Sequence, residues 1–121
     1  MEEKENIAVV EPDQEKDFWE DEDEKKKRKR LPRYRVILWN DDDHSFQYVI
    51  NMMRQIFGYD KTRGMIIATG VHTCGKITVA TLPFEVAELR RDQIRSFGPD
   101  PFLDQSTSSM YATIERLENQ D

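Results

Sequence analysis

The chain has 121 residues and a mass of 14.4 kDa, which suits one small domain with a tail and excludes a multidomain enzyme. Its formal net charge of -6 is unevenly distributed: residues 1–32 hold 12 acidic and 8 basic side chains, and residues 33–121 hold 12 and 10. A nearly neutral body argues against a dedicated nucleic-acid module, which is usually basic. A single cysteine, Cys74, excludes an internal disulfide and suits a reducing compartment.

Apolar runs in the sequence are short. No stretch reaches the roughly 18 residues of a membrane span, and the N-terminal region contains no apolar segment flanked by basic residues. We therefore expect neither membrane insertion nor ordinary secretion, and we expect a cytoplasmic protein. No feature indicates an obligate assembly, so a monomer is expected.

Residues 1–32 contain two charge blocks of opposite sign. Nine acidic side chains occur within residues 11–24, and residues 25–30 read KKKRKR. Such blocks bury too little apolar surface to offset chain entropy, so residues 1–32 are predicted to form a disordered tail before a core domain at 33–121.

The first predicted element is a strand over residues 33–39, where β-branched and aromatic side chains are frequent. It stops at residues 40–43, one Asn followed by three Asp, which favour turns because their side chains hydrogen-bond to the backbone. Helical spacing of apolar side chains follows over residues 46–57. Ser45 is placed to cap the start of this helix, and Gly58 is placed to close its end.

A second helix is predicted over residues 61–73, with Asp60 as its N-cap and Gly75 beyond its end. Its glycines and β-branched side chains give it a poor intrinsic helix propensity, so its formation must depend on packing. Alternation of apolar and polar side chains then resumes over residues 76–82 as a second strand.

Pro83 suits the first turn of a third helix, because its missing N–H is not needed there. This helix ends before residues 98–101, which read GPDP. After a loop rich in Ser, Asp and Gln, residues 110–117 form a weaker third strand. The order β-α-α-β-α-β predicts a single small α/β domain in which a three-stranded antiparallel sheet packs against helices.

Polar side chains follow the first predicted strand and end the second predicted helix. Asn40 and Asp41 lie in the turn after the strand, and His72 lies near the helix end. If the two helices pack side by side against the sheet, these three residues converge at the rim of an apolar pocket. An amide, a carboxylate and a neutral imidazole all offer lone pairs to an ammonium group. A free peptide N-terminus with a bulky first side chain matches such a site.

Four segments in this order resemble the ClpS adaptor family. They are YRVILWNDD at residues 34–42 with FQYV at 46–49, then VHTCGK at 71–76, EVAE at 85–88 and ATIE at 112–115. Each segment is a weak signal alone, but their order together is specific. The resemblance covers residues 33–97 and resumes near residue 108.

This resemblance implies a non-enzymatic adaptor that binds proteins bearing a bulky hydrophobic N-terminal residue, an N-degron, and hands them to the AAA+ unfoldase of the Clp protease. It implies that the substrate's N-terminal residue is held by Asn40, Asp41, Asp42 and His72. It implies a hydrophobic pocket formed by His44, Phe46, Val49, Ala68, Val71 and Met110. Contacts to the N-terminal domain of the unfoldase fall on Glu85 and Arg90.

Two departures from the family pattern concern the pocket. Residues 44–46 read His-Ser-Phe where the family typically has Thr-Pro-Met, and Ala68 stands where a methionine usually helps to close the pocket. Phe46 is expected to narrow one side of the pocket, while Ala68 opens another. We therefore expect an altered ranking among Phe, Leu, Tyr and Trp as first residues, because a methylene-sized mismatch is worth about 1 to 3 kcal/mol.

Two alternatives belong to other classes of protein. Zinc accepts the ligand types supplied by Asp43, His44, His72 and Cys74, although no C-x-x-C or H-E-x-x-H spacing is present. The basic run at residues 25–30 suits a nucleic-acid-binding protein, whose binding would weaken steeply with salt. Against both, we expect an adaptor with no cofactor, no metal and no nucleic-acid or membrane partner.

Overall fold

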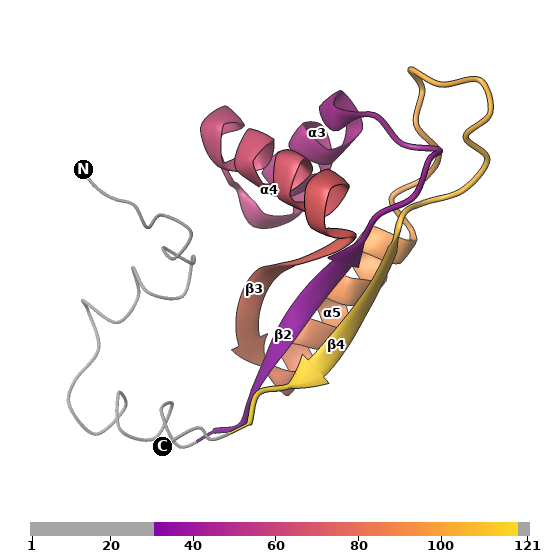
Figure 1. The fold of residues 1–121 in the computed structure, drawn as a ribbon. Helices are drawn as coiled ribbons and strands as arrows, with labels where there is room; N and C mark the ends of the chain where they lie inside the picture. The colour runs from indigo at the N-terminus through magenta and orange to yellow at the C-terminus, as the bar shows by residue number, and fades with distance from the viewer. Residues whose placement is uncertain (1–30, 119–121) are drawn as a thin grey trace.

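The fold is seen in a computed structural model that describes residues 31–118 (Figure 1). Most of the charged tail predicted at residues 1–32 therefore lies outside the described residues. The order of elements is β-α-α-β-α-β, which confirms the predicted fold class. The elements are β2 (Arg33–Trp39), α3 (Phe46–Phe57), α4 (Lys61–Cys74), β3 (Lys76–Pro83), α5 (Phe84–Arg95) and β4 (Tyr111–Arg116).

β2 is the central strand of a three-stranded sheet with the order β3-β2-β4, and both pairings are antiparallel. Helix α5 lies along one face of the sheet, while α3 and α4 pack against each other at the end where β2 leaves it (Figure 1). The loop that joins α5 to β4 returns to this same end. The turn after β2, the end of α4 and the α5–β4 loop therefore meet at one end of the domain.

The caps of the first two helices are those predicted. The Ser45 hydroxyl accepts a hydrogen bond from the N–H of Tyr48, and the Asp60 carboxylate accepts one from the N–H of Arg63. Each helix ends at a glycine in the left-handed region, which residues with a Cβ rarely adopt. These glycines are Gly58, with φ 75°, and Gly75, with φ 88°.

Close packing compensates for the poor helix propensity of α4. A Cβ on Gly64 would lie 3.1 Å from the Cα of Ile50 in α3, and a Cβ on Gly70 would lie 2.5 Å from Cδ1 of Ile77 in β3. The two glycines thus let α4 approach a helix on one side and a strand on another. This agrees with the expectation that tertiary contacts, and not propensity, stabilise the helix.

A bulge interrupts the pairing of β2 with β3. Val36 pairs with Ala80 and Ile37 pairs with Thr78, so Val79 is an extra residue on β3. The Val79 carbonyl accepts a hydrogen bond from the Tyr59 hydroxyl at 2.8 Å. The polar group that the bulge displaces is therefore satisfied by the segment between α3 and α4.

The start of α5 differs from the prediction. Pro83 closes β3 and precedes the helix, with φ -59° and ψ 156°, instead of occupying the first helical turn. The backbone is extended there because Pro83 still pairs with Arg33 of β2. The last strand is one residue shorter at each end than the predicted 110–117, although the N–H of Leu117 still donates to the Arg33 carbonyl at 2.9 Å.

A single hydrophobic core joins the sheet to the three helices. Every described element contributes to it. The side chains with no exposed surface include Val36, Leu38, Met52, Met53, Ala68, Ala87, Ile94 and Ala112.

Candidate functional site

The predicted acceptor residues lie where the turn after β2 meets the end of α4. The N–H of Asn40 donates to the Gly75 carbonyl at 2.9 Å, which ties the start of the turn to the cap of α4. His72 precedes Gly75 by less than one helical turn. The side chains of Asn40, Asp42 and His72 are exposed, and that of Asp41 is partly exposed.

Phe46 and His72 come into direct contact across the two helices. Their ring centroids lie 5.5 Å apart, and the ring planes meet at 69°. Phe46 begins α3, whereas His72 lies in the last turn of α4. The sequence predicts that Phe46 lines the pocket and that His72 holds the amino group of the substrate. The structure brings these two side chains together.

Four of the residues predicted to line the pocket are buried in this conformation. None of their side chains is more than 3% exposed, and all belong to the hydrophobic core; they are Val49, Ala68, Val71 and Met110. Val49 follows Phe46 by three residues, so these two side chains share one face of α3. Ala68 precedes His72 by four residues, so these two share one face of α4. The aromatic contact therefore stands one helical turn from this apolar part of the core.

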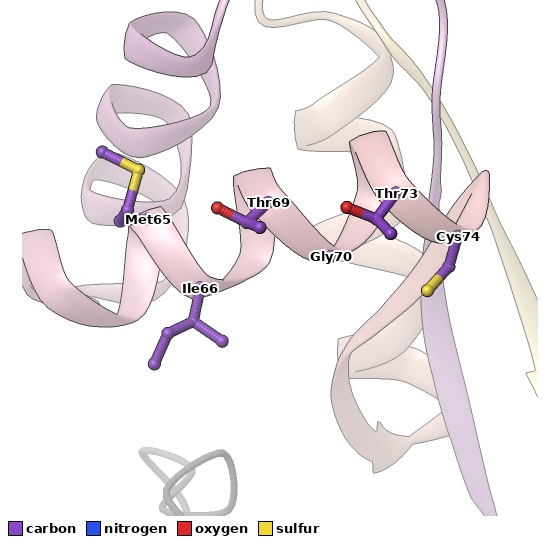
Figure 2. Close-up of a pocket in the computed structure, with 6 residues that line it drawn as sticks. All are labelled: Met65, Ile66, Thr69, Gly70, Thr73 and Cys74. Carbon is purple, nitrogen blue, oxygen red and sulfur yellow. The ribbon is translucent and has the colours of Figure 1, made fainter.

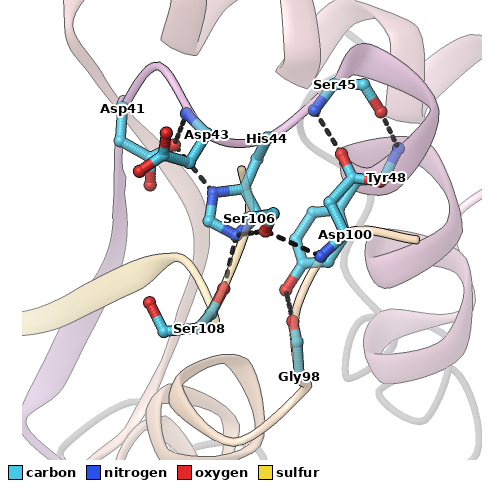
Figure 3. A network of polar contacts seen from close by, with 9 residues as sticks. All are labelled: Asp41, Asp43, His44, Ser45, Tyr48, Gly98, Asp100, Ser106 and Ser108. Carbon is cyan, nitrogen blue, oxygen red and sulfur yellow. Dashed lines mark hydrogen bonds and ion pairs between the residues drawn. The ribbon is translucent and has the colours of Figure 1, made fainter. Parts of the chain in front are cut away.

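His44, predicted as a pocket residue, lies in a polar environment in this structure. Its side chain is 2% exposed, and both ring nitrogens contact oxygen atoms (Figure 3). Nδ1 lies 2.7 Å from Oδ1 of Asp41, and Nε2 lies 2.7 Å from the carbonyl oxygen of Ser108. An imidazole is polar at both nitrogens, so the α5–β4 loop, which supplies the second partner, draws it into a polar network.

The loop of residues 98–109 docks on the start of α3 (Figure 3). The Tyr48 hydroxyl donates to the Gly98 carbonyl at 2.6 Å, and burial raises the pKa of this phenol. The N–H of Ser45 donates to Oδ2 of Asp100 at 2.6 Å. From the sequence this loop is notable only for its polar composition, and none of its residues is predicted to belong to the site.

Asp100 is a buried carboxylate that the surrounding groups keep ionised. Burial by itself raises the pKa of Asp100, but hydrogen bonds from the N–H groups of Ser45 and Phe102, together with the Ser45 hydroxyl and the nearby His44, outweigh it. The pKa of Asp100 is therefore lowered. The carboxylate also lies beside the N-terminus of α3, where the helix dipole favours negative charge.

The two residues assigned to the unfoldase both lie on α5. Glu85 is exposed in the first turn, and Arg90 is partly buried, with its guanidinium donating to Oε1 of Gln93 at 2.9 Å. Five residues along a helix correspond to a rotation of about 140° from one face. The two side chains therefore leave α5 in different directions.

An open hollow of about 420 Å³ lies on the outer face of α4 (Figure 2). Met65 and Ile66 are 40% and 45% exposed there. Apart from Cys74, which the zinc alternative used, no residue of this hollow was assigned to a site from the sequence, because apolar spacing alone does not distinguish an exposed stripe from a buried one. Its lining consists of Met65, Ile66, Thr69, Gly70, Thr73 and Cys74.

The zinc alternative has no site in the described part of the chain. Across residues 31–118, no group of three or more His, Cys, Asp and Glu side chains is placed to hold a metal ion. Asp43, His44, His72 and Cys74 therefore do not come together as ligands.

The basic run at residues 25–30 lies outside the described residues. No helix within residues 31–118 has the length and apolar character of a membrane span.

The fold and the polar turn match one class of protein, the adaptors of ATP-dependent Clp proteases. Residues 29–100 match the family model described as "ATP-dependent Clp protease adaptor protein ClpS". This match covers more than half of the chain, and the chain belongs to the ClpS family.

Relatives at moderate identity agree with this assignment. The chain is 33% identical over 66 residues to the ClpS adapter protein of Hydrogenovibrio crunogenus, a match that covers 54% of this chain and 64% of that protein. It is 37% identical over 73 residues to the ClpS adapter protein of a Synechococcus species, covering 60% of this chain and 80% of that protein. The chain thus spans slightly less than two thirds of the length of the first of these relatives.

A solved structure shares the fold. Agrobacterium tumefaciens ClpS2 bound to L-phenylalaninamide superposes with a TM-score of 0.64 at 20% sequence identity. The match covers 73% of this chain and 100% of that chain. At this identity the likeness concerns the arrangement of the backbone.

Proposed function

We propose that this chain is an adaptor that binds proteins with a free, bulky hydrophobic N-terminal residue and delivers them to the Clp unfoldase and protease. Membership of the ClpS family supports the proposal. The observation that carries it is the backbone hydrogen bond from Asn40 to Gly75, which holds an acceptor-rich turn against the end of α4, close to His72. The proposed activity is binding, and no bond cleavage is assigned to the chain.

Asp41 is the proposed acceptor for the ligand ammonium group. Its Oδ1 contacts the N–H of Asp43 and the ring of His44, while Oδ2 has no hydrogen-bond partner among residues 31–118. The Asp41 side chain is 34% exposed, so a ligand can reach it. An ionised α-amino group gains a charge-assisted hydrogen bond at this oxygen, whereas an acetylated amine has no charge to contribute.

The first side chain of the ligand is proposed to enter between α3 and α4, beside Val49, Ala68 and Val71. In the described conformation these residues are buried one turn away from the contact between Phe46 and His72. Entry therefore requires the Phe46 ring to rotate away from His72. Phe46 is 39% exposed, so its ring has solvent into which to move. The gain on binding is the burial of ligand apolar surface, about 25 cal/mol per Å².

Delivery is proposed to use α5. Glu85 and Arg90 are assigned to the N-terminal domain of the unfoldase; they lie in the first turn and the middle of α5, whose C-terminal end is the one that approaches the turn after β2. The adaptor can then hold a substrate and the unfoldase at the same time. We propose that it does so as a monomer in the cytoplasm.

Fluorescence anisotropy with labelled peptides tests the binding step. The peptides differ only in their first residue, and each is measured with a free and with an acetylated amine. We expect tight binding for large apolar first residues and a loss of at least about tenfold on acetylation, because the charged hydrogen bond is removed. Equal binding of the two forms would falsify the proposed recognition of a free N-terminus.

Delivery is tested with a fluorescent reporter that begins with Phe, mixed with Clp unfoldase and peptidase. Addition of the chain is expected to accelerate loss of fluorescence. Glu85→Lys and Arg90→Glu are expected to slow degradation while leaving peptide affinity unchanged, since both residues precede the last turn of α5, the end that leads to the loop beside the turn. If degradation stays at the rate of the reporter alone with the wild-type chain, the delivery step is wrong even where binding is found.

A further inference from the structure

His44 occupies a buried position between the proposed amine acceptor and the α5–β4 loop (Figure 3). Its side chain is 2% exposed, and its ring packs on Tyr48 with centroids 4.5 Å apart. The ring touches Asp41 with one nitrogen and the Ser108 backbone with the other, across 64 residues of sequence. This side chain therefore adds a link between the turn after β2 and the loop, beside the hydrogen bond from the N–H of Ser45 to Asp100.

The partner atoms determine which ring nitrogens carry hydrogen. Oδ1 of Asp41 is a carboxylate oxygen and the Ser108 oxygen is a carbonyl, so each accepts and neither donates. At 2.7 Å both contacts lie within hydrogen-bond distance, and both are hydrogen bonds when Nδ1 and Nε2 each carry a hydrogen. The ring then forms an ion pair with Asp41.

The loop that holds the far side of His44 is itself well anchored. Oγ of Ser106 accepts from the N–H of Asp100 at 2.8 Å and lies 3.3 Å from Nε2 of His44. The Gly98 N–H donates to Oγ of Ser109 at 2.6 Å. The ring is consequently fixed at both ends, and it can fix the Asp41 carboxylate in turn.

We propose that His44 is a positioning residue, which orients the Asp41 carboxylate toward the ligand ammonium group and makes that orientation depend on the loop of residues 98–109. His44 holds Oδ1, so that Oδ2 faces outward as the acceptor. The loop contributes to affinity through this ring without touching the ligand. The inference rests on the proposed recognition of a free N-terminus.

Two isosteric substitutions separate the two ring contacts. The amide nitrogen of Asn reaches about as far as Nδ1 of histidine, so His44→Asn keeps a donor to Asp41 and loses the contact with Ser108. The amide nitrogen of Gln reaches about as far as Nε2 of histidine. His44→Gln therefore keeps the contact with the Ser108 carbonyl and loses the contact with Asp41. Both variants replace the ring by a neutral amide, so each controls for the loss of the ring in the other.

Peptide anisotropy with free and acetylated amines provides the measurement. We expect His44→Gln to weaken binding of the free-amine peptide about tenfold and His44→Asn to weaken it less than about threefold, with the acetylated peptide unaffected by either. Equal losses in the two variants, or a larger loss in His44→Asn, overturn the positioning role but leave the proposed function intact. If the wild-type chain does not distinguish the two amines, the proposed function fails and this inference falls with it.

A measurement on the wild-type chain does not depend on how the variants fold. The ring nitrogens of His44 are observed by NMR while a free-amine or an acetylated peptide is titrated. A positioning residue predicts two N–H groups on the ring and a change in the Nδ1 signal with the free-amine peptide only. A single ring N–H, or identical changes with both peptides, would overturn the inference.

Discussion

The rings of Phe46 and His72 meet at 69° with their centroids 5.5 Å apart, and this contact joins the first residue of α3 to the last turn of α4. It lies one helical turn from the buried Val49 and Ala68. In the described conformation the apolar residues of the proposed pocket are thus buried next to the aromatic pair. The proposed binding mode therefore requires the Phe46 ring to leave His72.

Replacement of Phe46 by Ala is expected to change the ranking of ligands. Without the ring, the space between the helices is wider, and peptides that begin with Trp gain relative to those that begin with Leu by about tenfold. Phe46→Tyr keeps the ring and serves as the matched control. Anisotropy with the two peptides measures the ratio, and the same ratio in both variants would show that Phe46 does not shape the pocket.

Removal of the Asp41 charge is expected to weaken binding of free-amine peptides. Asp41→Asn keeps the size of the side chain but loses the charge-assisted hydrogen bond, which is worth about 1.5 to 3 kcal/mol, or about tenfold to a hundredfold in Kd. Asp43→Asn is the control, because the contact of this exposed neighbour with Asp41 uses its backbone N–H. Unchanged affinity in Asp41→Asn would assign the ammonium group to another acceptor.

The two glycines of α4 are expected to respond differently to alanine. Alanine is favoured over glycine by about 1 kcal/mol in a helix interior. At Gly70 the new Cβ meets only the end of the Ile77 side chain, which can rotate, whereas at Gly64 it meets the backbone of Ile50 at 3.1 Å. We therefore expect Gly70→Ala to be close to neutral and Gly64→Ala to lower the free energy of unfolding by about 1 to 2 kcal/mol.

Urea unfolding followed by circular dichroism measures this difference. The double variant Gly70→Ala/Ile77→Val removes the atom that the new Cβ meets, so its coupling energy reports the cost of the contact. If Gly64→Ala is the more stable single variant, the close approach of α4 to α3 is not a constraint on this helix.

Asp100 is expected to stabilise the domain at neutral pH and to lose this effect in acid. Its pKa is lower in the folded chain than the value of about 3.9 for an unfolded one, because hydrogen bonds to the ionised form outweigh burial. The contribution is fully present above the unfolded pKa and disappears as the pH falls through the folded pKa.

The variant Asp100→Asn tests this sign. It is expected to lower the free energy of unfolding by about 2 kcal/mol at pH 7, and the difference from wild type should shrink below about pH 4. Asp104→Asn, at an exposed position in the same loop, is the control. A difference that stays constant from pH 7 to pH 3 would show that the charge of Asp100 has no part in holding the loop.

Local patterns in the sequence were sufficient to predict the elements and their order. Ser45, Gly58, Asp60 and Gly75 act as caps through bonds to residues a few positions away, so the chain spacing alone reveals them. Pro83 was predicted in the first turn of the helix, whereas it ends β3 and precedes the helix. The sequence does not reveal this, because Pro83 pairs with Arg33, which lies 50 residues earlier in the chain. The acceptor residues Asn40, Asp41 and His72 came from the residue types together with the family resemblance.

The sequence by itself determined the strands and the helices, because periodicity and capping are properties of neighbouring residues. The ligand chemistry that it predicts for the turn rests on the residue types there. Tertiary structure alone decided that His44 joins Asp41 to Ser108, that Phe46 meets His72, and that the intended pocket wall belongs to the core. The contacts of Phe46 with His72 and of His44 with Ser108 connect positions 26 and 64 residues apart, and the burial of the pocket residues depends on how tightly two helices approach. Hydrogen bonds and packing between residues so far apart in the chain depend on which segments the overall fold brings together, and no local pattern in the sequence encodes that.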